Sequence, residues 1–179
     1  MSLKITGGYL KGRIIKTPSG RDTRPTLARV RGAIFSMIQH DIENANVLDI
    51  FAGSGALTIE ALSRGAASAV LIENNRKTAG IIKTNLDSLE LKSRILNADY
   101  KKAFQILKSE SLNFDIIFAD PPYDLIEPSQ LASEISEYSL IKPGGLFILE
   151  HAGNIIPDDV RKIKTRRFGD SAISVFHYE

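Results

Sequence analysis

The chain contains no cysteine among its 179 residues. This absence excludes disulfide scaffolds, thiol nucleophiles, zinc ribbons and iron–sulfur clusters. No apolar run approaches the ~20 residues of a membrane-spanning helix, and none near the N-terminus has signal-peptide length. The three histidines, His40, His151 and His177, lack the spacing of metal ligands. We therefore expect a cytoplasmic protein with no bound metal and no membrane partner.

Charges of both signs are present, but they are unevenly distributed. Residues 1–31 hold eight lysines and arginines and a single acid, Asp22, so this segment carries +7. The whole chain carries +2, so the remainder is mildly acidic at −5. A basic segment on an acidic body is typical of proteins that dock on polyphosphate, although a solvated surface would have the same composition.

From residue 45 onward, short apolar runs alternate with amphipathic stretches. The runs cover residues 46–50, 69–73, 94–98, 115–119 and 146–150. Such alternation predicts an α/β fold, in which a mostly parallel sheet carries helices on both faces. Two further runs, 162–168 and 172–178, are separated by Gly169 and Asp170 and predict an antiparallel hairpin at one edge of the sheet.

The N-terminal segment predicts a small unit of its own. Short runs at 4–6 and 13–16 could pair as a hairpin, and a helix follows with Thr26 as its N-cap. The apolar stripe of that helix turns Arg29 toward solvent. We therefore expect two parts, a basic extension over residues 1–44 and an α/β domain over residues 45–179.

A glycine turn, defined here as residues 51–55, joins the run at 46–50 to a helical stretch. Glycines let the backbone approach a ligand closely, and the exposed amides at a helix start attract negative charge. In open α/β sheets such a turn lies where nucleotides bind. A phosphate-binding loop would need Lys-Ser/Thr after Gly55, but Ala56 and Leu57 stand there.

Two acids specify the ligand of this turn further. Asp49, at the end of the first run, suits a ligand with a cationic amine. Glu73 follows 24 residues later and is placed to accept hydrogen bonds from both hydroxyls of a ribose. These features together favour S-adenosylmethionine. NAD stays an alternative, although Thr58 stands where a dinucleotide fingerprint needs glycine or alanine.

A second motif, Asp120-Pro121-Pro122-Tyr123, follows the run at 115–119. The two prolines remove amide donors and leave carbonyls as acceptors. The Asp120 carboxylate and the Pro121 carbonyl would each accept one N–H of an exocyclic amine, and Tyr123 would stack on the base. Held in this way, the amine lone pair points at the sulfonium methyl group, so the motif predicts methyl transfer by in-line displacement.

With these motifs in view, the sequence resembles the RsmD family, which methylates guanine N2 in bacterial 16S ribosomal RNA. The segments that carry the resemblance are 8–13, 24–26, 29–31, 51–57 and 60–65, together with Phe35. Asp99 and the sequence Lys142-Pro143-Gly144-Gly145 are typical of the wider methyltransferase superfamily.

The resemblance implies a Rossmann-like methyltransferase with a seven-stranded sheet, an antiparallel C-terminal edge hairpin and a basic N-terminal extension. It implies that S-adenosylmethionine is the methyl donor and S-adenosylhomocysteine the product. The residues expected to bind the cofactor are Asp49, Phe51, Ala52, Gly53, Ser54, Gly55, Glu73, Asn74, Asp99 and Tyr100. The catalytic residues would be Asp120, Pro121 and Tyr123.

The basic extension then has ribosomal RNA as its expected partner, whether naked or in an assembling small subunit, with the enzyme a monomer. The expected RNA contacts are Arg13, Arg24, Arg29 and Arg31. Gly32 and Ser36 depart from the family pattern, which usually has an acid and an asparagine there. Two other classes stay open, namely a methyltransferase acting on adenine N6 or cytosine N4 of DNA or other RNA, and a non-catalytic RNA-binding module.

Overall fold

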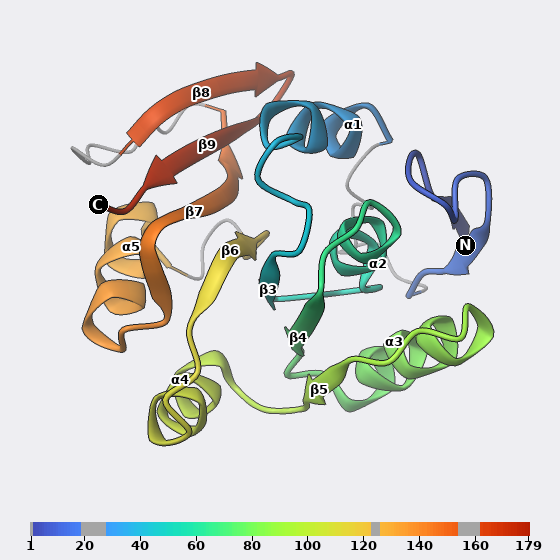
Figure 1. Ribbon diagram of the computed structural model, residues 1–179, viewed down its shortest axis with the longest axis horizontal. Coiled ribbons are helices and arrows are strands. Elements are labelled where there is room, and N and C mark those ends of the chain that lie inside the picture. Colours follow the sequence, from blue (N-terminus) through green and yellow to red (C-terminus); the bar gives the residue numbers. More distant parts are fainter. Residues whose placement is uncertain (1, 19–27, 123–125, 154–161) are drawn as a thin grey trace.

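The computed structural model describes residues 2–18, 28–122, 126–153 and 162–179. Within these residues, seven strands form one sheet in the order β5-β4-β3-β6-β7-β9-β8 (Figure 1). The strands are β3 (Asn46–Ile50), β4 (Ser68–Ile72), β5 (Arg94–Leu96), β6 (Phe114–Ala119), β7 (Ile141–Ala152), β8 (Lys162–Phe168) and β9 (Ser171–His177). Strands β3 to β7 are parallel, and β9 runs antiparallel to both β7 and β8. The predicted fold class, including the C-terminal edge hairpin, is therefore confirmed.

Five helices connect or cover these strands in the described residues. They are α1 (Ala28–Met37), α2 (Ala56–Ser63), α3 (Arg76–Ser88), α4 (Tyr100–Ser109) and α5 (Pro128–Glu137). None of them has both the length and the apolar character needed to cross a membrane.

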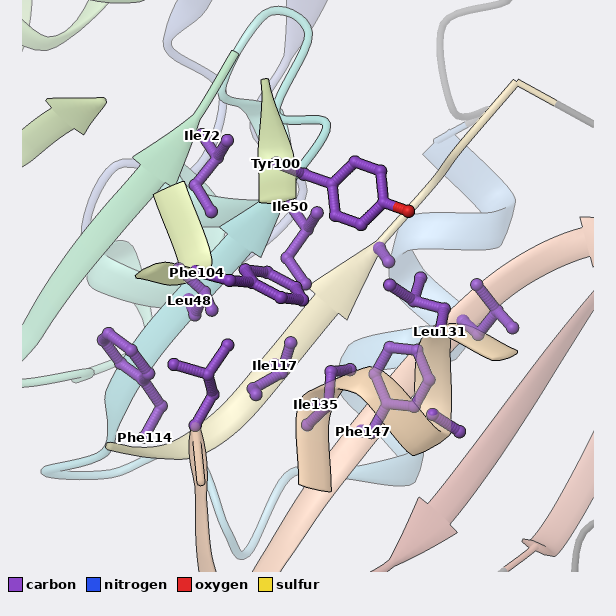
Figure 2. Close-up of a cluster of buried hydrophobic side chains, with 14 of the residues drawn as sticks. Leu48, Ile50, Ile72, Tyr100, Phe104, Phe114, Ile117, Leu131, Ile135 and Phe147 are labelled. Atoms are coloured by element: carbon purple, nitrogen blue, oxygen red, sulfur yellow. The ribbon is translucent and has the colours of Figure 1, made fainter. Parts of the chain in front are cut away.

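Alternate residues of each central strand face opposite layers. Leu48 and Ile117 pack with α4 and α5, in the cluster that Figure 2 shows around Phe104 and Phe147. Their neighbours Val47 and Phe118 pack instead with α1 and α2. Because strands buried on both faces need apolar residues throughout, these segments appear as continuous apolar runs in the sequence.

The N-terminal hairpin, β1 (Ser2–Lys4) with β2 (Ile14–Lys16), forms a separate two-stranded sheet beside α2 and α3 (Figure 1). Its loop is fixed to the end of α2, where the Ser63 hydroxyl donates to the Gly7 carbonyl at 2.7 Å. Gly8 has a φ of 74°, and a Cβ there would lie 1.8 Å from the Ser63 carbonyl oxygen. The predicted hairpin is present, and only glycine fits at its closest approach to the domain.

Helix α1 is not separate from the sheet, because Val30 and Ile34 belong to the same apolar cluster as β3 and β6. The boundary at residue 44 therefore divides the chain in sequence while α1 packs on the sheet, and the two-part division stays a prediction. Thr26, the predicted N-cap, lies outside the described residues.

Arg31 corrects one sequence-based prediction, because its side chain is fully buried. Its Nε donates to the Glu60 carboxylate at 3.2 Å, and its Nη2 donates to the Lys4 carbonyl at 2.7 Å. Glu60 is equally buried and also binds Arg64 and the Thr6 hydroxyl. Arg31 therefore joins α1, α2 and the hairpin inside the protein, and the expectation that it contacts RNA is wrong.

Several strand boundaries differ from those predicted, and β1 covers Ser2–Lys4 where the run at 4–6 was expected. β7 begins at Ile141, five residues earlier than expected, and β5 ends at Leu96, two residues earlier. The early part of β7 is held by the C-terminus, where the Tyr178 amide donates to the Gly145 carbonyl at 3.0 Å. Gly144, with φ at 78°, makes the irregular backbone of this stretch possible.

Candidate active site

The glycine turn leaves β3 at the carboxyl edge of the sheet and enters α2. Phe51, Gly53 and Gly55 all have positive φ, at 64°, 56° and 76°. The Ala52 amide donates to the Ile72 carbonyl at 2.9 Å, and the Gly55 amide donates to the Ala52 carbonyl at 2.7 Å. A non-glycine residue at positive φ is strained, so Phe51 is held there by its surroundings. The turn is thus a rigid feature that opens a helix N-terminus at the sheet edge.

Asp49 lies beneath this turn and is 2% exposed. Its Oδ2 accepts hydrogen bonds from the Thr58 amide at 3.2 Å and from the Thr58 hydroxyl at 2.7 Å. Burial, together with the charges of Asp120 and Glu73, raises the pKa of Asp49 to about 7, although the hydrogen bonds from Thr58 lower it. In this structure Asp49 braces the first turn of α2, and its contact with a cationic ligand amine stays a prediction.

Glu73 holds the other side of the glycine turn. Its Oε2 accepts from the Gly53 amide at 3.0 Å, and its Oε1 accepts from the Asn75 amide at 2.7 Å. The residue is partly exposed, so its carboxylate is open to a ligand while it fixes the turn. The sequence placed Glu73 near the turn, and these two hydrogen bonds show how closely the residues are joined.

The residues that end β5 continue the same edge. The Asn97 side-chain amide donates to the Glu73 carbonyl at 2.7 Å and to the Asn74 carbonyl at 3.1 Å, which ties β5 to β4. Asp99 is exposed and caps α4 by accepting from the Lys101 amide at 2.9 Å.

Tyr100 has a side chain that is 7% exposed and lies between two other rings. Its ring centroid is 5.3 Å from that of Phe51 and 5.4 Å from that of Phe104. Burial raises the pKa of its hydroxyl well above the ordinary value, and the nearby Glu134 carboxylate adds to the effect. The Tyr100 side chain thus belongs to the hydrophobic core. The predicted cofactor contact would therefore be made by the Tyr100 backbone.

The Asp120-Pro121-Pro122 segment follows β6 at this same edge. Ala119, the last residue of β6, is in register with Ile50 of β3 and Leu149 of β7. Asp120 is partly exposed and lies close enough to Asp49 for its charge to raise the pKa of that carboxyl. Pro121 is buried and Pro122 exposed, whereas Tyr123 lies outside the described residues. The acceptor motif and the glycine turn thus share one edge of the sheet.

Glu150, near the end of β7, is an acid that the sequence reasoning missed. Burial and the charge of Asp120 together raise the pKa of Glu150 to about 8, although a hydrogen bond from Ser171 lowers it. Its Oε2 is buried without a hydrogen-bond partner among the described residues. A signal was available, since Glu150 ends a buried parallel run, as Asp120 follows another. We name Asp49, Asp120 and Glu150 the carboxyl row.

A small apolar recess of about 10 Å³, with room for a single water molecule, lies beside Glu150. Pro121 and Glu150 both line it, together with Pro128, Leu131 and Leu149. The recess therefore connects the acceptor motif on β6 with the missed acid on β7.

The other predicted RNA contacts lie in different surroundings. Arg13 is exposed on the hairpin, and its guanidinium donates to the Ser88 carbonyl at 3.4 Å. Arg29 is exposed on α1, 5.8 Å above the ring of Phe168. Arg24 lies outside the described residues. The hairpin also exposes the aromatic ring of Tyr9, which is 71% accessible.

Comparisons with known proteins show where this arrangement recurs. A family model described as Conserved hypothetical protein 95 matches residues 3–177. The Bacillus subtilis protein YlbH is 32% identical over 97% of this chain and 98% of its own length. Ribosomal RNA small subunit methyltransferase D of Escherichia coli K12 is 39% identical over 122 residues, which are 68% of this chain and 60% of that protein.

Solved structures give the same picture. The Escherichia coli protein yhhF superposes with a TM-score of 0.87 at 30% identity, covering 100% of this chain and 99% of that one. The Thermus thermophilus 16S rRNA N2 methyltransferase RsmC, solved with AdoMet and guanosine, has a TM-score of 0.74 at 21% identity. It covers 100% of this chain and 50% of its own, and at that identity the likeness concerns the fold.

Proposed function

This chain belongs to the Conserved hypothetical protein 95 family, the RsmD family, and from that membership and the site geometry we propose that it is an S-adenosylmethionine-dependent methyltransferase of ribosomal RNA. Its acceptor is the exocyclic N2 amine of a guanine in the small-subunit RNA. The observation that carries the proposal is the placement of Asp120 at the sheet edge that also holds the glycine turn.

The cofactor occupies the edge above β3, β4 and β5. Glu73 binds the ribose hydroxyls, because its carboxylate already lies at the turn and the residue retains exposed surface. The amides of the glycine turn approach the methionine part, and Asp49 balances its ammonium group. The structural neighbour RsmC was solved with AdoMet, which supports this choice of donor over NAD.

Asp120 and the Pro121 carbonyl hold the target amine opposite the sulfonium. The nitrogen lone pair forms the new N–C bond as the S–CH₃ bond breaks, and S-adenosylhomocysteine leaves as a neutral thioether. The product nitrogen then gives up one proton, for which Asp120 is the nearest acceptor on the motif. Positioning and electrostatics carry this step, since an amine nucleophile conjugated with a base needs orientation more than a strong base.

The basic N-terminal extension supplies RNA affinity. Arg13 and Arg29 are exposed, and their described contacts are a backbone carbonyl and an aromatic ring, so their charges are available to phosphates. The partner we propose is small-subunit RNA, whether naked or within an assembling particle, bound by a monomeric enzyme.

One experiment tests this function. The purified protein is incubated with methyl-labelled S-adenosylmethionine and, separately, naked 16S RNA, small subunits from a strain that lacks the protein, and duplex DNA. We expect label in RNA as N2-methylguanosine. Label in DNA, or on adenine N6 or cytosine N4, would assign the activity to another amine. No label in any substrate would contradict the proposed activity and favour a non-catalytic RNA-binding module.

A further inference from the structure

Glu150 stands out among the acids at the sheet edge because one of its carboxyl oxygens is unsatisfied. The carboxyl accepts a hydrogen bond from Ser171, while Oε2 is buried and unpartnered in the described structure. Folded proteins rarely leave a buried polar atom in this state, and exceptions cluster at functional sites. The Oε2 atom is therefore placed to bind a group that is not part of this chain.

Glu150 lies close to Asp120. Ala119 pairs with Leu149, and both of these residues face α4 and α5. Glu150 is the next residue of β7, so its side chain turns to the opposite face, toward α1 and α2. Asp120 directly follows the end of β6, and its charge acts on the Glu150 carboxyl.

The Glu150 carboxyl can act as a hydrogen-bond donor. Burial, with the negative charge of Asp120 beside it, raises the pKa of Glu150 to about 8. Near neutral pH Glu150 therefore keeps its proton. Its O–H then lies near Asp120, the acceptor proposed for the target amine.

The Watson–Crick edge of guanine presents the complementary pattern. Its N2 amine is a donor at one end, and its O6 carbonyl is an acceptor at the other. The cofactor site proposed at Gly53 and Glu73 lies on the β3–β4 side of Asp120, so a base held by Asp120 extends toward β7, where Glu150 lies.

We propose that Glu150 selects guanine, its carboxyl O–H donating a hydrogen bond to O6 while Asp120 accepts from the N2 amine. This inference rests on the function proposed above and adds a specificity-determining residue to it. Adenine carries no oxygen at the corresponding place, so it would leave the Glu150 donor unpaired.

The test compares two target bases in one RNA. Once the modified guanine is mapped, a short RNA is made with guanine or 2-aminopurine at that position. 2-Aminopurine keeps the amine and lacks O6. We expect the wild-type protein to prefer guanine by 10- to 100-fold in kcat/KM, and Glu150→Ala to lose that preference by slowing on guanine alone. Glu150→Gln, whose amide N–H also donates, should keep most of it.

Controls separate this role from a folding defect. Glu137→Ala removes an exposed acid at the far end of α5 and should match the wild-type protein. Calorimetric S-adenosylmethionine affinity should be equal in all variants. If Glu150→Ala keeps the guanine preference, or slows equally on both bases, the inference is overturned. If the wild-type protein methylates no guanine N2 at all, the proposed function itself has failed.

The pH profile gives an independent readout. The groups that face Glu150 are Asp120 from β6 and Ser171 from β9, with Asp49 beyond Asp120 and exposed Arg29 on the covering helix α1. Above pH 8 Glu150 loses its proton, so wild-type activity on guanine should fall relative to Glu150→Gln. Titration of the guanine itself affects both proteins equally. A wild-type rate that rises relative to Glu150→Gln would mean a carboxylate acceptor, and it would overturn the donor role.

Discussion

Replacing Glu60 by leucine should destabilise the protein severely, because it removes the carboxylate that pairs with the buried Arg31 charge. Both side chains of the pair have an exposed fraction of 0%. Removing one partner of a buried ion pair costs about 3–5 kcal/mol, since the remaining charge has lost its compensation. Domains have total stabilities of about 5–15 kcal/mol, so Glu60→Leu should remove a large part of the free energy of unfolding.

The effect is measurable by denaturant and thermal unfolding followed by circular dichroism at pH 7. For a chain of this length each kcal/mol moves the melting temperature by about 2–4 °C, so we expect a fall of roughly 6–20 °C. Glu110→Leu is the matched control, because the Arg94–Glu110 pair lies at the surface. Breaking that pair should leave the melting temperature almost unchanged.

A double variant separates charge from shape. Glu60→Leu combined with Arg31→Met removes both charges and should recover most of the loss, since apolar replacements of a buried pair are often neutral. The recovery will be incomplete, because the Lys4 carbonyl loses its Arg31 donor and the Thr6 hydroxyl loses its Glu60 acceptor. The reasoning is refuted if Glu60→Leu costs less than about 1 kcal/mol, or if the double variant is no more stable than the single one.

The remaining predictions concern the site and its surroundings. Asp120→Ala should keep S-adenosylmethionine binding and lose at least about 100-fold in single-turnover methyl transfer, because one positioned acceptor is worth about 2.7–4 kcal/mol; an unchanged rate would rule out the acceptor role. Glu73→Ala should weaken S-adenosylmethionine binding by about 10- to 100-fold in calorimetry, since hydrogen bonds to a charged group contribute about 1.5–3 kcal/mol; wild-type affinity would dispose of the ribose contact. For Asp49, the folded-state pKa of about 7 exceeds the unfolded value of 3.8, so the folded state binds the extra proton. The stability due to the protonated form is complete below pH 4 and is lost as the pH rises to 7, by up to about 4 kcal/mol. Asp49→Asn should therefore flatten the dependence of the free energy of unfolding on pH between pH 4 and pH 7. An unaltered pH dependence would contradict the raised pKa. Arg29→Glu should weaken RNA binding and lower the slope of log affinity against log salt concentration by about one, because each phosphate that an arginine neutralises releases about one counterion; an unchanged slope would place RNA elsewhere.

The sheet could be predicted from the sequence because its strands are buried on both faces. The run at 46–50 coincides with β3, and the run at 162–168 with β8. Each apolar run is bounded by polar or glycine residues, so few alternative secondary structures compete with a strand in these segments. The edges were less certain, since the start of β7 depends on backbone bonds to the C-terminus that no local pattern reveals.

The site was predicted where the signal is local and missed where it depends on distant partners. The glycine turn is one continuous segment of the sequence, and so is the motif that begins at Asp120. Both lie at the carboxyl edge of the sheet, as expected. Arginine is usually a surface residue, so the sequence alone places Arg31 in solvent. Its burial depends on Glu60, which lies 29 residues away in the sequence. The role proposed for Glu150 depends on the register of β7 against β6, which a single sequence does not reveal.

The contacts of Asn85 decide how the N-terminal hairpin can be studied. Its side-chain amide accepts from the Lys16 amide at 2.8 Å and donates to the Lys16 carbonyl at 2.8 Å, in the manner of a neighbouring strand. The same amide nitrogen reaches the Ser54 carbonyl at 2.9 Å. A truncated chain lacking the hairpin would therefore free Asn85 and loosen residue 54 of the glycine turn. Deletion of the hairpin would alter RNA affinity and S-adenosylmethionine affinity together. Charge reversal at exposed Arg13 should change RNA affinity alone.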